Sequence, residues 1–122
     1  IKELCANVEH MFSISCIFMY GEDASIRNHE TAIHIYYIIH EAINNAIKHG
    51  NAKNILIMMK RHTDGMLISI EDDGMGFDPL KTHTNGLGLS IMKYRASIIG
   101  GTLKINAGDH AGAYVACMFN PD

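Results

Sequence analysis

The stretch from Glu30 to Gly50, ETAIHIYYIIHEAINNAIKHG, decides the fold because it is a long segment with helical periodicity. Its apolar residues cover one side of a helix, namely Ile35, Ile39, Ala42, Ile43, Ala46 and Ile47. Its polar residues fall within one arc of the other side, namely Glu41, Asn45, Lys48 and His49. Polar residues at 28–31 can start this helix, and Gly50 with Asn51 can end it. The pattern predicts an amphipathic helix, whose polar face is in most such helices simply solvated.

Shorter segments on both sides of this helix predict a mixed sheet. Residues 1–10 are typical of the end of a helix, and strands are expected at 13–20, 53–61, 66–72, 102–106 and 113–119. Asp64 and Gly65 predict a hairpin between the second and third of these strands. Residues 77–85 are expected to form a loop, and residues 87–99 a helix that ends at Gly100. These elements favour an α+β fold, an α/β sandwich with helices packed on one face of a mixed sheet.

Composition indicates one folded domain covering residues 1–122. Apolar residues make up 48% of the 122 residues and charged residues 19%. A net charge of -3 argues against a nucleic-acid partner, and the longest apolar run is too short for this chain to insert into a membrane. Cys5, Cys16 and Cys117 lack metal-site spacing, which favours reduced, buried thiols and a cytoplasmic location. A chain that opens on Ile1 rather than Met is expected to be excised from a longer protein.

The polar face of the long helix carries groups suited to a phosphate-bound metal. Asn45 offers a side-chain oxygen of the kind that Mg²⁺ prefers when phosphate oxygens share its coordination. Glu41, one helical turn away, could position water or the ion, and Lys48 could neutralise phosphate charge. These residues therefore predict a magnesium and phosphate site on this face.

The segment Asp72-Asp73-Gly74-Met75-Gly76 follows a predicted strand and is open to two interpretations. Asp-Gly is common in ordinary turns. Alternatively, Asp72 accepts a hydrogen bond from the exocyclic amine of adenine, where guanine would present a carbonyl and leave a buried charge unpaired. Gly74 and Gly76 would then let the backbone turn tightly and approach the flat base.

The segment Asn85-Gly86-Leu87-Gly88-Leu89 is expected to open the last helix. Free amides at a helix N-terminus, approached through glycines, form a site for anions. A flexible loop leading into a helix is the simpler interpretation. Neither a P-loop nor a Rossmann glycine pattern is present in the sequence.

Together and in this order, the three segments resemble the N box, the G1 box (DxGxG) and the G2 box (GxGL) of the GHKL superfamily. The chain is similar to the ATP-binding catalytic domain of bacterial sensor histidine kinases, and residues 88–101 are especially like the kinases related to nitrate and nitrite sensors. The resemblance implies the Bergerat fold. It also implies that Asn45 binds Mg²⁺, that Lys48 contacts phosphate and that Glu41 occupies the position of the general base of the ATPase branches. By the same resemblance, His49 lies beside the nucleotide and Asp72 reads adenine in a pocket shaped by Gly74 and Gly76. Residues Asn85, Gly86, Leu87, Gly88 and Leu89 would close the lid.

The resemblance also implies an activity and partners. A domain of this kind binds Mg·ATP and donates the γ-phosphoryl group to a histidine on a separate dimerisation domain of the same parent protein, which can be membrane-anchored. The phosphoryl group then passes to a response regulator. His10 lies near the right end of the chain, but the residues after it do not resemble an acceptor motif, so the acceptor is expected outside this chain.

Two alternatives remain open at this point. An anti-sigma-factor serine kinase shares this fold and has an N box much like residues 41–50. Arg95 and Ala96, with the Ile99-Gly100-Gly101 sequence, favour the histidine kinase. The second alternative is a regulatory module that binds nucleotide without transferring phosphate.

Overall fold

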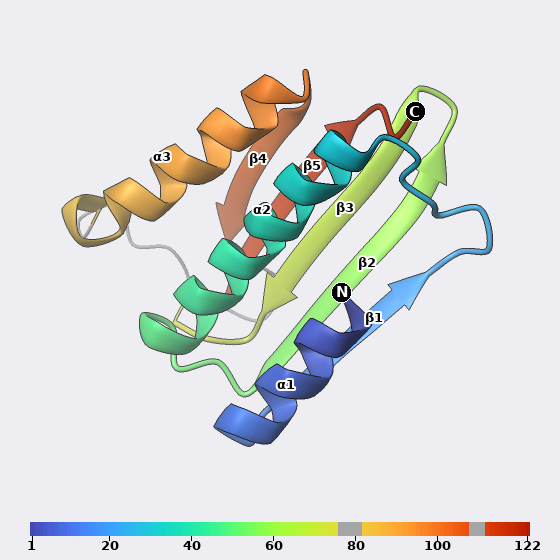
Figure 1. The fold of residues 1–122 in the computed structure, drawn as a ribbon. Coiled ribbons are helices and arrows are strands. Elements are labelled where there is room, and N and C mark those ends of the chain that lie inside the picture. The colour runs from blue at the N-terminus through green and yellow to red at the C-terminus, as the bar shows by residue number, and fades with distance from the viewer. Residues whose placement is uncertain (76–81, 108–111) are drawn as a thin grey trace.

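The computed structural model describes residues 1–75, 82–107 and 112–122, apart from the side chains of residues 82–87 and 107. In these residues, helices cover one face of a five-stranded sheet with strand order β1-β2-β3-β5-β4 (Figure 1). The elements are α1 (Lys2–Phe12), β1 (Ser15–Tyr20), α2 (His29–Lys48), β2 (Asn54–His62), β3 (Gly65–Asp72), α3 (Thr82–Ile98), β4 (Thr102–Ala107) and β5 (Ala113–Phe119). β1 pairs with β2 in parallel, and the other neighbouring strands are antiparallel. The predicted α+β sandwich with a mixed sheet is confirmed.

The core lies between this sheet and the helices. Alternate residues of β2 and β3 are buried, and the register pairs Ile57 with Ile70 and Met59 with Ile68. These side chains share one face of the sheet because successive residues of a strand point to opposite faces. Buried isoleucines of α2 join the same core cluster. The apolar residues that alternate along the strands and those that repeat with helical periodicity therefore form a single apolar layer.

Both ends of α2 are fixed by hydrogen bonds. At the start, the side chain of Asn28 accepts a bond of 3.1 Å from the backbone amide of Thr31. At the end, the amides of His49 and Gly50 both donate to the carbonyl oxygen of Asn45, at 3.0 and 3.1 Å. Asn51 then adopts a positive φ of 52°, which turns the chain away from the helix. This closure holds Asn45, His49 and Gly50 beside one another.

The structure corrects the predicted boundary of the last helix. α3 begins at Thr82, so residues 82–85, expected in a loop, are helical, and the segment Asn85–Leu89 does not open the helix. Amides from the fifth residue of a helix onward bond within it, so the amides of residues 86–89 do not form a free anion site. Glycines cost about 1 kcal/mol each in a helix, but α3 packs on α2 and buries Met92 and Ala96. Tertiary packing therefore overrides local propensity here. The remainder of the predicted loop, residues 77–81, lies outside the described residues.

Two properties expected from composition can be compared with the structure. Cys5, Cys16 and Cys117 are buried and free, and burial raises the pKa of Cys16 to about 12 and that of Cys117 to about 11. All three thiols are therefore protonated at neutral pH. Within the described part of the chain, no helix combines the length and apolar character needed to cross a bilayer.

Asp73 joins the end of β3 to the start of β2. Its Oδ1 accepts from the amides of Lys53 and Asn54, both at 2.9 Å, and its Oδ2 accepts from Asn54 Nδ2 at 2.7 Å. The hydrogen bond from the Asn54 side chain is the main reason that the pKa of Asp73 is lowered. The carboxylate is exposed to solvent, so its contribution to stability is modest.

We predict that Asp73→Ala lowers the free energy of unfolding by about 1 kcal/mol at pH 7. A lowered pKa in the folded state means that this contribution is present above the unfolded pKa of about 4 and is lost as the pH falls through the folded pKa. Urea unfolding of both proteins at pH 7 and at pH 3 measures the difference. A difference of the same size at both pH values would contradict the assignment.

Candidate functional site

A cavity of about 40 Å³ opens between the C-terminal half of α2, the end of β3 and α3. Its walls come from five parts of the chain, namely the end of α2, β3, α3, β4 and β5. The lining residues are Ala42, Asn45, Ala46, His49, Gly50, Ile70, Asp72, Leu89, Met92, Ile105, Ala113 and Val115. Most of these side chains are apolar or small, and only Asn45, His49 and Asp72 carry polar side-chain atoms. A flat apolar ligand with a few polar edge atoms fits such a lining.

Asp72 reaches the cavity because it continues the inward-facing series of β3. Met66, Ile68 and Ile70 are buried on the helix-covered face, and Asp72 is the next residue in that alternation, 8% exposed. Its Oδ1 accepts from the amide of Gly74 at 2.8 Å and from the amide of Ala113 at 3.4 Å. Burial raises the pKa of Asp72, and the two amide hydrogen bonds oppose that rise. A carboxylate placed at the edge of an apolar core is an unusual arrangement that points to a ligand.

Close backbone contacts hold Asp72 in this place. The chain after Asp72 packs on the end of α2, where the amide of Met75 donates to the carbonyl oxygen of Gly50 at 2.8 Å. A Cβ added at Gly74 would lie 2.5 Å from that same oxygen. On the other side, a Cβ added at Gly112 would overlap the carbonyl oxygen of Asp72 and lie 2.7 Å from its Oδ1. Glycine is therefore required on both sides of the aspartate.

The polar groups of α2 lie against α3. A Cβ added at Gly88 would lie 2.6 Å from Glu41 Oε1 and 3.5 Å from Asn45 Oδ1. Three residues predicted to belong to one site, from two different motifs, therefore meet at the same place. The absence of a side chain at Gly88 leaves the oxygens of Glu41 and Asn45 close to the helix backbone.

The other predicted site residues differ in whether they line the cavity. His49 and Leu89 line the cavity, whereas Lys48 is exposed and lies outside its lining. Asn85, Gly86 and Leu87 belong to α3, and their side chains are not among those described. Gly76 lies outside the described residues.

Several residues of the cavity were missed by the motifs. Ala113 is the first residue of β5, 41 residues beyond Asp72, and Gly50 follows the end of α2. Gly112, just before β5, packs against Asp72. The glycine-containing segment before β5 is the only trace of this contact in the sequence, and it predicts a turn. Ile105, Met92 and Val115 read as ordinary core residues. Ile105 and Val115 reach the cavity because β5 pairs with β3, a long-range contact that no local pattern reveals, and Met92 reaches it through the packing of α3 on α2.

We predict that Gly112→Ala lowers the free energy of unfolding by at least about 2 kcal/mol, because the new methyl group meets backbone rather than a movable side chain. Gly21→Ala is the matched control, since the nearest atom to its added Cβ is the side-chain Oδ1 of Asp23 at 3.1 Å. Chemical denaturation of both variants measures the effect. Equal stability of the two variants would contradict the close contact between Gly112 and Asp72.

Comparison with known proteins places this geometry in a family. Residues 30–121 match the family described as histidine kinase-, DNA gyrase B- and HSP90-like ATPase. The sensor histidine kinase ComP of Bacillus subtilis (strain 168) is 35% identical over 85 residues, which are 68% of this chain and 11% of ComP. The nitrate/nitrite sensor protein NarQ of Escherichia coli (strain K12) is 36% identical over 88 residues, 71% of this chain and 16% of NarQ. The chain thus spans less than a fifth of the length of these relatives.

Solved structures agree with this placement. The ATP binding domain of PrrB from Mycobacterium tuberculosis superposes with a TM-score of 0.65 at 25% identity, covering 74% of this chain and 68% of that chain. The histidine kinase AdeS of Acinetobacter baumannii gives 0.76 over 98% of this chain and 60% of its own, although at 15% identity it supports the fold alone. The predicted resemblance to sensor histidine kinases, including nitrate and nitrite sensors, is confirmed. Since the family model covers most of its length, the chain belongs to the histidine kinase-, DNA gyrase B- and HSP90-like ATPases.

Proposed function

We propose that residues 1–122 form the ATP-binding catalytic domain of a sensor histidine kinase that is longer than this chain. The observation that carries the proposal is the buried carboxylate of Asp72, held at the edge of an apolar cavity that Asn45 also lines. The curated relatives above are named as sensor histidine kinases, which favours this function over an anti-sigma-factor serine kinase.

Asp72 is suited to recognise adenine. Both amides that reach its carboxylate from the described residues donate to Oδ1, which leaves Oδ2 for a donor on the ligand. The exocyclic amine of adenine is such a donor. Guanine presents a carbonyl at that position, so two acceptors would face each other in a poorly solvated place. The apolar walls from Ile70, Met92 and Val115 would contact the faces of the base.

Asn45 and Glu41 are suited to the metal and phosphate end of the nucleotide. Asn45 Oδ1 is a neutral oxygen, which fits a magnesium ion held mainly by phosphate oxygens and water. Glu41 lies at the same contact with α3 and would position water or the ion. Lys48, exposed at the end of α2, would approach the phosphates as a cation. When bound, Mg²⁺ neutralises phosphate charge and draws the nucleotide into one orientation.

The proposed reaction transfers the γ-phosphoryl group to a histidine on a dimerisation domain of the parent protein. The bond between the γ-phosphorus and the bridging oxygen breaks, and ADP leaves with the electron pair of that bond. The unprotonated imidazole nitrogen forms the nitrogen–phosphorus bond, and the other ring nitrogen then releases its proton to solvent. This chain supplies positioning and electrostatic stabilisation, which account for most of the catalysis in phosphoryl transfer. A response regulator then receives the phosphoryl group.

Calorimetric titration of the chain with ATP, ADP and GTP, each with and without Mg²⁺, tests the proposal. We expect adenine nucleotides to bind and GTP to fail at the same concentrations. A folded sample that binds none of the three nucleotides would contradict it. If the parent protein binds ATP but phosphorylates none of its histidines, the remaining interpretation is a regulatory module that binds nucleotide without transferring phosphate.

We predict that Asp72→Asn weakens ATP binding by about 100-fold. The amide oxygen takes over the hydrogen bonds from Gly74 and Ala113, so the amide NH₂ faces the amine of adenine and two donors oppose each other.

Because burial raises the pKa of Asp72, ionisation of this carboxyl lowers stability as the pH rises from about 4 through its folded pKa. The variant should therefore be at least as stable as the wild type at pH 7, as measured by thermal unfolding. Loss of binding together with a large loss of stability would point to misfolding rather than to base recognition.

Asn45→Ala should abolish the tightening of ATP binding that Mg²⁺ produces, because it removes the oxygen proposed to bind the ion. Asn44→Ala is the matched control, since Asn44 contacts His40 at 3.2 Å instead of lining the cavity. Calorimetry with and without Mg²⁺ compares the two variants. An unchanged affinity of Asn45→Ala for Mg·ATP would exclude this role for Asn45.

A further inference from the structure

α2 and α3 lie side by side on the helix-covered face and run in opposite directions (Figure 1). Two contacts mark the ends of their shared interface. One is the approach of Gly88 to Glu41 described above, and the other joins Arg95 on α3 to His34 on α2. Seven residues separate His34 from Glu41, and seven separate Gly88 from Arg95. The two contacts are therefore about 10 Å apart along both helices, so their spacing on α2 matches their spacing on α3.

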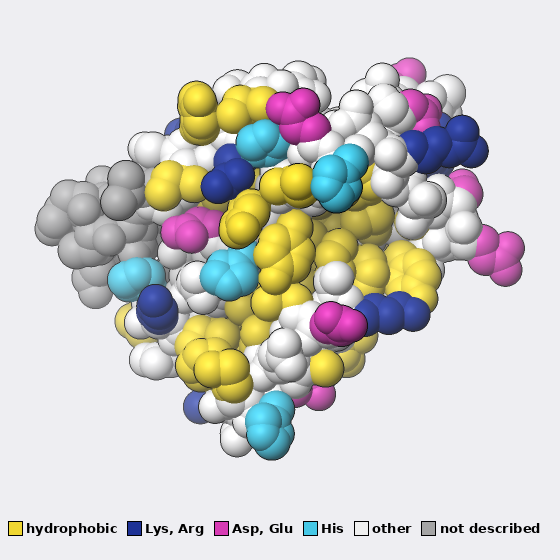
Figure 2. Space-filling view, viewed as in Figure 1, with side chains coloured by type: hydrophobic (Ala, Val, Ile, Leu, Met, Phe, Trp, Pro, Cys, Tyr) yellow, Lys and Arg dark blue, Asp and Glu magenta, His cyan; other side chains and the backbone are white. Residues whose placement is uncertain are grey.

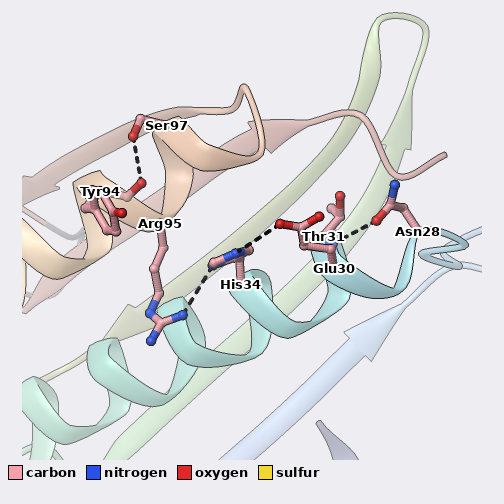
Figure 3. A network of polar contacts seen from close by, with 7 residues as sticks. All are labelled: Asn28, Glu30, Thr31, His34, Tyr94, Arg95 and Ser97. Atoms are coloured by element: carbon pink, nitrogen blue, oxygen red, sulfur yellow. Dashed lines mark hydrogen bonds and ion pairs between the residues drawn. The ribbon is translucent and has the colours of Figure 1, made fainter.

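Arg95 is held by α2 through two different interactions, of which Figure 3 draws the hydrogen bond to His34. Its Nη1 donates to His34 Nδ1 at 3.2 Å, and its guanidinium carbon lies 4.4 Å from the centre of the Tyr37 ring. The Nε atom is buried and finds no acceptor among the described residues. Figure 2 shows histidine, basic and hydrophobic side chains gathered on this face, where Tyr37 is 46% exposed. The planar guanidinium can stack on Tyr37 and donate to His34 at the same time, whereas the ammonium of a lysine is a single point charge.

The contact also defines the state of His34. A guanidinium has only donors, so Nδ1 of His34 must be unprotonated and the ring proton must be on Nε2. Nε2 faces the carboxylate of Glu30 at 4.0 Å, one turn earlier on α2 (Figure 3). His34 and Tyr37 of α2 therefore bind the side chain of Arg95, and Glu30 lies next to His34 without contacting Arg95.

We propose that Arg95 is a positioning residue for the nucleotide site, acting through the axial position of α3 along α2. Leu89 and Met92, which lie between Gly88 and Arg95, line the cavity. The small clearance at Gly88 means that a shift of α3 changes its contact with the oxygens of Glu41 and Asn45. Anchoring Arg95 two turns away thus sets the wall of the cavity and the distance from α3 to the proposed metal ligand. The inference rests on the proposed function for its effect on ATP.

The test compares Arg95→Leu with Lys93→Leu, which removes a neighbouring, exposed positive charge from the same helix. Two quantities are measured on the whole chain: the affinity for ATP with Mg²⁺, and the NMR signal of the buried Met92 methyl group in protein labelled at methionine methyl carbons. We expect Arg95→Leu to shift the Met92 signal without nucleotide and to weaken ATP binding by about tenfold. Lys93→Leu should leave both unchanged. Arg95→Leu that matches Lys93→Leu in both measurements would overturn the inference.

Substitutions of His34 keep the test decisive if Arg95→Leu fails to fold. His34→Gln retains an acceptor for the guanidinium and should keep the wild-type Met92 signal and affinity, whereas His34→Leu should reproduce the effects expected of Arg95→Leu. Equal behaviour of the two His34 variants would contradict the positioning role. If the wild type binds no nucleotide, the proposed function fails, and the Met92 signal still decides whether Arg95 positions α3.

Discussion

The hydrogen bonds from the amides of Gly74 and Ala113 to Asp72 Oδ1 are the interaction on which the rest of the site depends. They tie the end of β3 to the start of β5 and hold a carboxylate where the alternation of the strand would otherwise continue the apolar core. Burial of the carboxylate disfavours its charged form, and two amides offset only part of that cost. The protein therefore retains a destabilising group at the edge of its core. A ligand that donates to Oδ2, which accepts no hydrogen bond from the described residues, would recover the missing interaction, and this supports the proposed recognition of adenine.

Helix α2 is the second constraint, because its two faces serve different purposes. Its isoleucines fill the core, while Glu41, Asn45 and His49 stand at or beside the cavity. The register of α3 against α2 then determines how close Gly88 comes to the oxygens of Glu41 and Asn45. The proposed base recognition by Asp72 and the proposed metal binding by Asn45 would thus be supplied by separate elements, β3 and α2, which both line one cavity.

The sequence was sufficient to predict the order of most elements and the mixed sheet, and it singled out several residues that line the cavity, because strand alternation, helical periodicity and glycine spacing are local signals. Asp72 could be predicted from its place after a strand and before two glycines. Gly112, Ala113 and Ile105 could not, since the predicted pair of final strands reaches the site only through the long-range pairing of β5 with β3. The start of α3 was predicted wrongly because Gly86 and Gly88 favour a loop locally, while packing on α2 stabilises a helix. The contact of Arg95 with His34 and Tyr37 was likewise invisible, since 61 residues separate Arg95 from His34 in sequence.

We propose that Asp72 recognises the exocyclic amine of adenine by accepting a hydrogen bond from it. The most direct test is the relative affinity of the wild-type chain for ATP and ITP in the same magnesium buffer. These nucleotides have the same ribose and phosphates and differ in the base, where ITP carries a carbonyl in place of the amine. We predict that ITP binds at least about 100-fold more weakly than ATP, because the carbonyl oxygen of its base, an acceptor, then faces the buried carboxylate of Asp72. Equal affinities for ATP and ITP would contradict it, since binding would then depend on the phosphates and the apolar walls without recognition by Asp72.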